Sequence, residues 1–246
     1  MYRRKQVGWQ EAVGLFLVIF LLLMVRNCAC GLEYFPQLDD YIQYHNYSSA
    51  ESFQALQQAT GLLASRPLAG LADYFLWGPM FDHMIWGVAL ISLLYAGTAL
   101  LFWRILGRYF RLSPLFPVVM TLLPLGVEGT YWMSASTRVV VGMFFGALAA
   151  WAFLHWLDGD GIGWLPLYLV LQLVPFGFYE QAGILSVTLT VGTAILELLL
   201  NRRDWRRCAV SLWGAPALGL YFLFTHLMAS GGVYSSRAEI ILPVSR

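Results

Sequence analysis

Residues 84–103 read MIWGVALISLLYAGTALLFW, a run without a charged side chain. A helix needs about 20 such residues to cross the hydrocarbon core of a bilayer, so this run predicts a membrane-spanning helix. We therefore expect an all-α polytopic transmembrane helical bundle of about seven spans, forming a single membrane domain over residues 1–246. The other six apolar runs are Ala12–Val25, Leu115–Val127, Val139–Leu157, Trp164–Phe178, Ala182–Leu200 and Ala209–Ala229.

The composition favours the same class of protein. Of the 246 residues, 59% are hydrophobic and 12% are charged, whereas a soluble domain carries about a quarter charged residues. The net charge of +1 provides no electrostatic attraction for nucleic acid, which we exclude as a partner. The cysteines at positions 28, 30 and 208 have no metal-binding spacing and are interpreted as packing residues.

Two of the apolar runs are too short to cross a bilayer alone as straight helices. Pro117 and Pro124 interrupt the first of them, and Pro166 and Pro175 interrupt the second. A proline inside the membrane is tolerated where neighbouring helices or water satisfy the carbonyl groups that it frees. We therefore expect these two spans to depend on their neighbours.

Basic residues are distributed unevenly between the two sides of the predicted bundle. Such residues gather on the cytoplasmic side of membrane proteins, so we expect a plasma or inner membrane protein with a cytoplasmic N-terminus. The first run then serves as an uncleaved anchor, and residues 31–82 form an extracytoplasmic loop between spans one and two. The ten basic residues on the predicted cytoplasmic side are Arg3, Arg4, Lys5, Arg104, Arg108, Arg111, Arg202, Arg203, Arg206 and Arg207, against five on the other side.

Two adjacent carboxylates, Asp39 and Asp40, follow the first span and are surrounded by tyrosines such as Tyr41. A carboxylate near the membrane surface is able to act as a general base on a hydroxyl, or to hold a divalent cation near a phosphate. Because neighbouring residues of a regular element point apart, one acid should face a site while the other orients the loop. Alternatively, both acids begin a helix as a solvated turn. Further along, Ser48 and Glu51 fit a capping box, which predicts a juxtamembrane helix.

Three further charged residues are candidates for binding a substrate. Glu128 and Glu180 each follow a Pro-broken span, and such spans often line a cavity. In an enzyme they would bind hydroxyl groups of a substrate or assist Asp40; otherwise they cap tight hairpins. Arg138 begins the fourth span. Its planar guanidinium group suits a phosphate leaving group. At this depth the arginine needs a partner, which would be a lipid phosphate or Glu128. The alternative for Arg138 is snorkelling to the headgroups. Arg66, in the first loop, is expected to be solvated.

The long outer loop after the first span, with Asp39-Asp40 and juxtamembrane helices, resembles the GT-C class of integral-membrane glycosyltransferases. The resemblance covers almost the whole chain as an arrangement, and Asp39-Asp40 is its one match at residue level. It implies a polyprenyl-phosphate-linked sugar as donor and a glycan, lipid or protein hydroxyl as acceptor, in glycan biosynthesis of the cell envelope. It further implies that Asp40 or Asp39 takes the acceptor proton in an inverting transfer and that Arg138 neutralises the departing phosphate. Tyr41 would stack on a sugar ring, and Mg²⁺ or Mn²⁺ at the acidic pair is optional.

The class usually continues into further spans or a periplasmic domain, whereas this chain stops at Arg246, just after the seventh span. We therefore expect an N-terminal fragment or a minimal version of the class. Two other functions stay open from the sequence. A transporter or flippase of a lipid-linked or small polar substrate would depend on Glu128, Arg138 and Glu180 rather than on the first loop. A non-catalytic membrane subunit would depend on no single polar residue.

Overall fold

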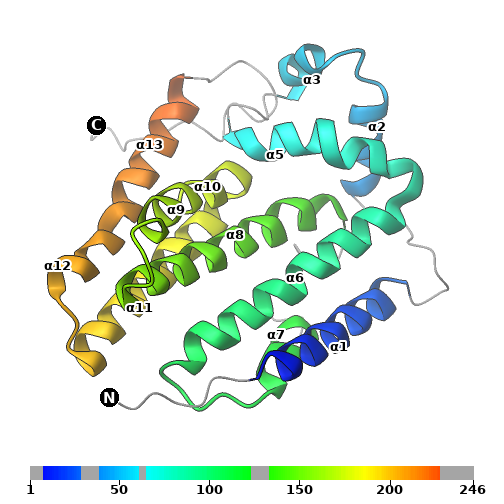
Figure 1. Cartoon of the computed structure of the whole chain (residues 1–246). Coiled ribbons are helices and arrows are strands. Elements are labelled where there is room, and N and C mark those ends of the chain that lie inside the picture. The colour runs from blue at the N-terminus through cyan, green and yellow to red at the C-terminus, as the bar shows by residue number, and fades with distance from the viewer. Residues whose placement is uncertain (1–7, 29–38, 61–64, 123–132, 228–246) are drawn as a thin grey trace, which may run out of the picture.

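The computed structural model describes residues 8–28, 39–60, 65–122 and 133–227, and within these ranges every regular element is helical (Figure 1). The predicted all-α class is therefore confirmed. The α-helices are α1 (Trp9–Asn27), α2 (Asp39–Ser48), α3 (Phe53–Thr60), α5 (Pro67–Ala72), α6 (Met84–Gly107), α7 (Leu115–Leu122), α8 (Met133–Asp158), α9 (Trp164–Leu171), α10 (Val174–Phe178), α11 (Glu180–Asn201), α12 (Trp205–Cys208) and α13 (Gly214–Leu227). A π-helical turn, η1 (Asp73–Trp77), and two 3-10 turns, η2 (Gly78–His83) and η4 (Ala209–Trp213), join neighbouring helices.

Five continuous helical segments in the described ranges are long and apolar enough to cross a membrane, and the chain is a multi-pass membrane protein. The run quoted above forms most of α6. Both Pro-containing runs give shorter helices, as the sequence predicts: α7 has 8 residues, and α9 is followed by the 5-residue α10. The five long segments are Trp9–Asn27, Pro67–Gly107, Met133–Asp158, Glu180–Asn201 and Trp205–Leu227.

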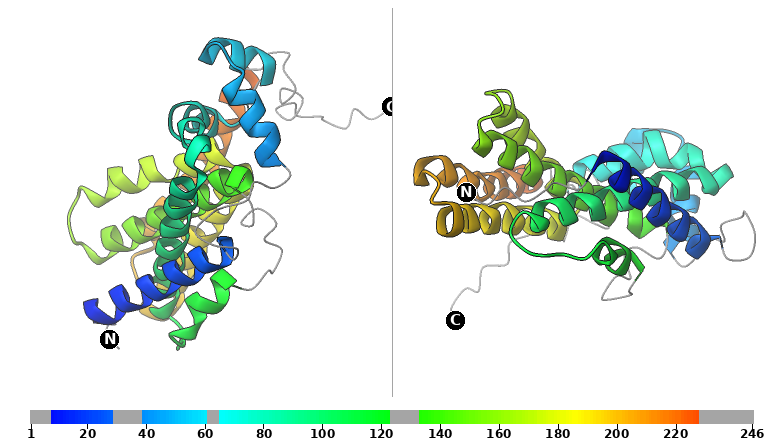
Figure 2. Two further views of the ribbon diagram at one scale, coloured as in Figure 1. Left: turned by 90° about the vertical axis from the view of Figure 1, so that its right-hand side faces the viewer. Right: turned by 60° about the horizontal axis from the view of Figure 1, so that its bottom comes forward.

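Helices α6, α8 and α11 run parallel to one another through the centre of the bundle. Their C-terminal ends meet, because Arg108, just after α6, binds Asp158 at the end of α8 and Glu197 near the end of α11. The N-terminal ends of α6 and α8 are also close together, because a Cβ atom on Gly87 of α6 would collide with Met133, the first residue of α8. Consecutive parallel helices require the chain to return between them. The short helices α7, α9 and α10 lie on these return passes, and Figure 2 shows α7 and α9 on opposite sides of the bundle.

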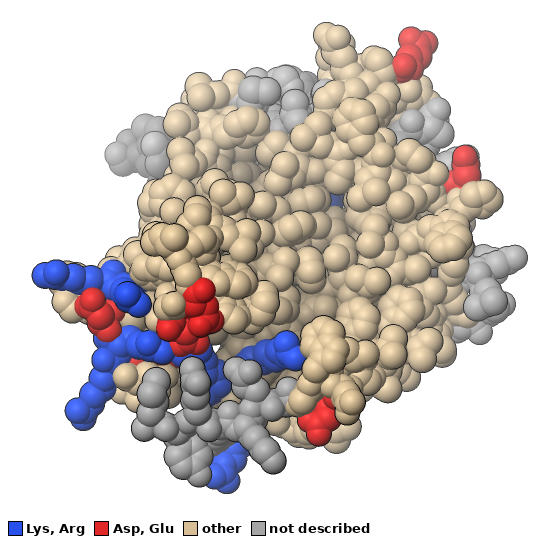
Figure 3. Space-filling model, viewed as in Figure 1, with Lys and Arg blue, Asp and Glu red and all other residues tan. Residues whose placement is uncertain are grey.

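The bundle therefore has two chemically different ends. We call the end that carries Arg108, Asp158, Glu197 and Arg203 the arginine end. The loop end carries α2, α3, α5 and the first turns of α8 and α11, at the top of Figure 1. Figure 3 shows a broad uncharged face, with most of its charged side chains gathered in one corner at the arginine end.

Neighbouring helices satisfy the carbonyl groups at the end of α7, as expected for a Pro-broken span. The residue four positions after Met120 is Pro124, which has no N–H to donate back to the Met120 carbonyl. The Tyr95 hydroxyl of α6 donates to that carbonyl at 3.4 Å, and Nη1 of Arg26 from α1 donates to the Thr121 carbonyl at 3.2 Å. These two side chains provide the hydrogen bonds that the broken helix lacks.

Two glycines allow α8 and α11 to approach closely. A Cβ atom on Gly142 would lie 2.7 Å from Cβ of Ala182, and one on Gly146 would lie 2.9 Å from Cβ of Ser186. Small residues spaced four apart are typical of helices that pack backbone to backbone in membranes. The pair of parallel helices on which the loop end is built thus depends on these two positions.

We expect Gly146→Leu to lower the free energy of unfolding by about 3 kcal/mol, the upper range for overpacking a close helix interface. The measurement is the unfolding midpoint of the purified protein in detergent. The matched control is Gly192→Leu on α11, where an added Cβ meets nothing within 4 Å and where we expect a change within about 0.5 kcal/mol. Equal losses in both variants would contradict close α8–α11 packing.

Candidate functional site

The side chain of Asp40, from α2, contacts the start of α8. This side chain is completely buried, and its Oδ1 accepts a hydrogen bond from the backbone N–H of Ser134 at 2.7 Å. The first N–H groups of a helix have no partner within the helix, so a carboxylate here satisfies one of them. Asp39 is exposed, which confirms that the two acids point apart. Both also lie in the first turn of α2, as the helix-start alternative predicts, but that alternative expected solvated acids and Asp40 is buried.

Arg138 lies one turn further along α8 and binds a different acid from the one considered in the sequence. Its Nη2 is 3.1 Å from Oδ2 of Asp73, the fully buried first residue of η1. The Arg138 side chain stays 16% exposed. The expected protein partner, Glu128, lies outside the described residues. Isolated π-turns are frequent at functional sites. In the sequence, the one feature that marks Asp73 is that it is an acid in an apolar stretch.

Arg66 is buried rather than solvated, which corrects the expectation from the sequence. Its Nε and Nη2 bind the two carboxylate oxygens of Glu180 at 3.1 and 2.9 Å, and its guanidinium lies over the ring of Tyr179, 4.7 Å from the centroid. The loop residue is thus attached to the first turn of α11. Such bidentate pairs fix geometry as well as charge.

Helix α5 is held at both of its ends by these ion pairs. Arg66 precedes its first residue and Asp73 follows its last, so one pair ties α5 to α11 and the other ties it to α8. Between them, Leu68 packs directly against Gly177 of α10. A Cβ atom added to Gly177 would lie 2.5 Å from Cγ of Leu68. The loop end is therefore closed by a short helix that is attached to both long helices.

The structure brings together some of the predicted site residues and separates others. Asp40 and Arg138 both lie at the first turns of α8, and Glu180 begins the adjacent α11. Tyr41 is 62% exposed and points away from the buried Asp40. Among the described residues no group of three or more His, Cys, Asp or Glu side chains is placed to hold a metal ion.

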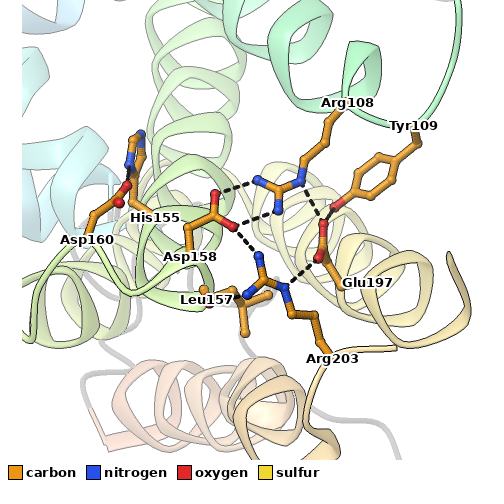
Figure 4. Close-up of polar contacts among 8 residues, drawn as sticks. All are labelled: Arg108, Tyr109, His155, Leu157, Asp158, Asp160, Glu197 and Arg203. Carbon is orange, nitrogen blue, oxygen red and sulfur yellow. Dashed lines mark hydrogen bonds and ion pairs between the residues drawn. The ribbon is translucent and has the colours of Figure 1, made fainter. Parts of the chain in front are cut away.

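A second polar cluster lies at the arginine end (Figure 4). Glu197 is fully buried, and three side chains bind its carboxylate. Nε of Arg108 lies 2.7 Å from it and Nε of Arg203 donates to it at 3.3 Å. The Tyr109 hydroxyl donates to it at 2.9 Å. Asp158 binds both arginines. The hydrogen bond to Asp158 raises the pKa of Arg108, and burial together with the charge of Glu197 raises the pKa of Tyr109 well above its usual range.

The arginine-end cluster acts as a structural clamp. Its positive and negative groups are paired with one another, and it joins the ends of three helices. Glu197 is also detectable in the sequence, because it is the single acid in the apolar run 182–200 and an intramembrane acid needs a partner. The partners themselves come from other helices and have no local signal.

Comparisons with protein-family models, with curated proteins and with solved structures find no match to this chain. The function is therefore inferred from the geometry of the loop end.

We expect Glu197→Gln to lower the free energy of unfolding by about 3 kcal/mol, because it removes the buried carboxylate that Arg108 and Arg203 share and leaves Asp158 as the acid that pairs with both. Unfolding of the purified protein in detergent micelles measures the loss. Asp160→Asn is the control: it removes an acid whose side chain is half exposed and pairs with His155, and we expect a change below about 1 kcal/mol. Similar losses in the two variants would contradict the clamp.

Proposed function

We propose that the chain is a membrane glycosyltransferase that works at its loop end, moving a sugar from a polyprenyl-phosphate donor to an acceptor hydroxyl. The supporting observation is that Asp40 binds the backbone of Ser134 while Arg138 lies four residues further along the same helix. Residues four apart share one face of a helix and are separated by about one turn, roughly 5–6 Å. A proton acceptor and a phosphate-binding cation thus approach the same region.

In the proposed reaction, Asp40 takes the proton of the acceptor hydroxyl as its oxygen attacks the anomeric carbon. The new bond forms as the bond from that carbon to the phosphate oxygen breaks, which inverts the configuration. The electron pair leaves with the polyprenyl phosphate, and the guanidinium of Arg138 stabilises its charge. Asp73 positions Arg138 through the 3.1 Å contact, so it acts as a positioning residue.

The orientation that we propose places the loop end outside the cytoplasm and the arginine end inside it. Seven of the basic residues lie on the described segments around the arginine end, from the last turn of α6 to α12. An excess of arginine and lysine near span ends marks the cytoplasmic side. The lipid-linked donor would then enter from the outer leaflet of the plasma or inner membrane.

This orientation predicts which exposed positions react with an impermeant maleimide in intact cells. In a variant without the native cysteines, Gln54→Cys at the loop end should be labelled in intact cells. Ile162→Cys, at a position 79% exposed in the turn between α8 and α9, should be labelled only after permeabilisation. The reverse pattern would exclude the proposed orientation.

We expect Asp40→Asn to reduce sugar transfer by about 10²–10⁴-fold, the usual contribution of a general base. The measurement is mass spectrometry of envelope glycans in a deletion strain complemented with each variant at equal membrane levels. An amide oxygen still accepts the Ser134 N–H, so the fold is retained. Asp39→Asn is the matched control and should restore the glycan. Full restoration by both variants would exclude a catalytic role for the pair.

Transport is a second candidate function, and one observation favours it. Helix α11 carries the buried polar side chains Ser186, Thr190, Thr193 and Glu197 on one face, and Thr190 donates at 3.2 Å to the buried Gln172 between α9 and α10. Polar side chains that meet a broken span are typical of substrate paths in transporters. Transport predicts that Gln172→Leu abolishes activity while Asp40→Asn preserves it, whereas transferase activity predicts the opposite.

A further inference from the structure

Three buried polar side chains near Asp40 make no hydrogen bonds through their polar atoms. Gln43 is 5% exposed, Trp77 1% and Ser134 3%. The atoms concerned are the amide oxygen and nitrogen of Gln43, the indole nitrogen of Trp77 and the hydroxyl oxygen of Ser134. Buried polar groups are nearly always hydrogen-bonded, because leaving them unpaired costs free energy. Several such groups in one place therefore need an explanation.

The three side chains come from elements that pack together at the start of α8. Among the α2 side chains that the structure describes, the buried ones are Asp40 and Gln43, one turn apart and on one face. Helix α2 contacts both α8 and η2. Trp77 directly precedes η2 and belongs to the same buried cluster as Met133, the neighbour of Ser134. The unpaired atoms thus lie on elements that pack together beside the Asp40–Ser134 contact.

We propose that Gln43, Trp77 and Ser134 form a subsite that binds the vicinal hydroxyls of a sugar ring beside Asp40. The inference rests on the proposed function in taking the ligand to be one of the two reacting partners. Each sugar hydroxyl both donates and accepts. The amide of Gln43 and the hydroxyl of Ser134 offer both roles, the indole N–H of Trp77 donates, and Asp40 accepts.

The same atoms disfavour a charged ligand. An anion at this position would meet the carboxylate of Asp40 and the acceptor oxygens of Gln43 and Ser134. A metal cation would meet the indole and amide N–H groups, which cannot coordinate it. A neutral ligand rich in hydroxyl groups satisfies the whole set.

Helix α2 covers the subsite, so the ligand reaches it when α2 moves away from α8. Tyr41 and Ile42 of α2 are both about 60% exposed, and the buried residues described on this helix are polar. Helices that bury little apolar surface open at low cost in free energy. The cover over the subsite is thus held in its described part by polar rather than apolar side chains.

Two variants test the subsite by removing the unpaired atoms at nearly constant volume: Gln43→Met and Ser134→Ala. In the ligand-free protein each should raise the unfolding midpoint in detergent by about 2–4 °C, because a buried group without a partner is removed. The matched control, Gln54→Met on the exposed face of α3, should leave the midpoint unchanged. A lower midpoint in both variants overturns the proposal, because the atoms would then be making stabilising bonds.

Binding is measured with the methyl glycosides of glucose, mannose and galactose as probes, with inorganic phosphate for comparison. At least one glycoside should raise the midpoint of the wild-type protein and of Gln54→Met, and this rise should be lost in Gln43→Met. No rise with any glycoside, or an equal rise in Gln43→Met, overturns the proposal.

If Asp40→Asn still transfers sugar while Gln43→Met loses the rise, the proposed mechanism fails and the subsite stands. If Asp40→Asn abolishes transfer while Gln43→Met keeps the rise, the mechanism stands and the subsite fails.

Discussion

Glu197 is the residue on which the arrangement of the bundle depends most. Its buried carboxylate binds Arg108 and Arg203, and a charge in this position is stable only while both contacts are present. The contacts bring the C-terminal ends of α6, α8 and α11 together, and parallel alignment of these helices follows. The chain must then return twice along the bundle, and the short, Pro-containing helices α7, α9 and α10 lie on these return passes. As a result, the first turns of α8 and α11 meet at the loop end.

The loop end uses the same kind of contact for a different purpose. Arg66 and Asp73, at either end of α5, attach that helix to α11 and α8. Both contacts are partly or fully buried, and removal of either partner would leave a charge in a site of low polarity. Helix α5 is therefore fixed at both ends, and Asp40 attaches α2 to α8 through the hydrogen bond from the Ser134 N–H.

Most of the fold could be predicted from the sequence because it depends on local properties. Length and polarity of the apolar runs define the spans, and prolines define the two that are broken. The partners of Arg66 and Arg138 could not be predicted, because they lie 114 and 65 residues away along the chain. For the same reason Arg66 was expected to be solvated. The separation of Asp39 from Asp40 was predictable from helix geometry, whereas the unpaired atoms of Gln43, Trp77 and Ser134 emerge only when three elements pack together.

The parallel alignment of α6, α8 and α11 has an electrostatic consequence. Each helix carries a macrodipole with its positive end at the N-terminus, so three positive ends meet at the loop end and three negative ends meet opposite. Asp40 and Glu180 lie at the positive ends, where a carboxylate is favoured. Asp158 and Glu197 lie at the negative ends, where a carboxylate is disfavoured, and their arginine partners compensate for this. The arginines that indicate membrane orientation therefore also neutralise the aligned dipoles, so removing them would weaken the fold and the topology signal together.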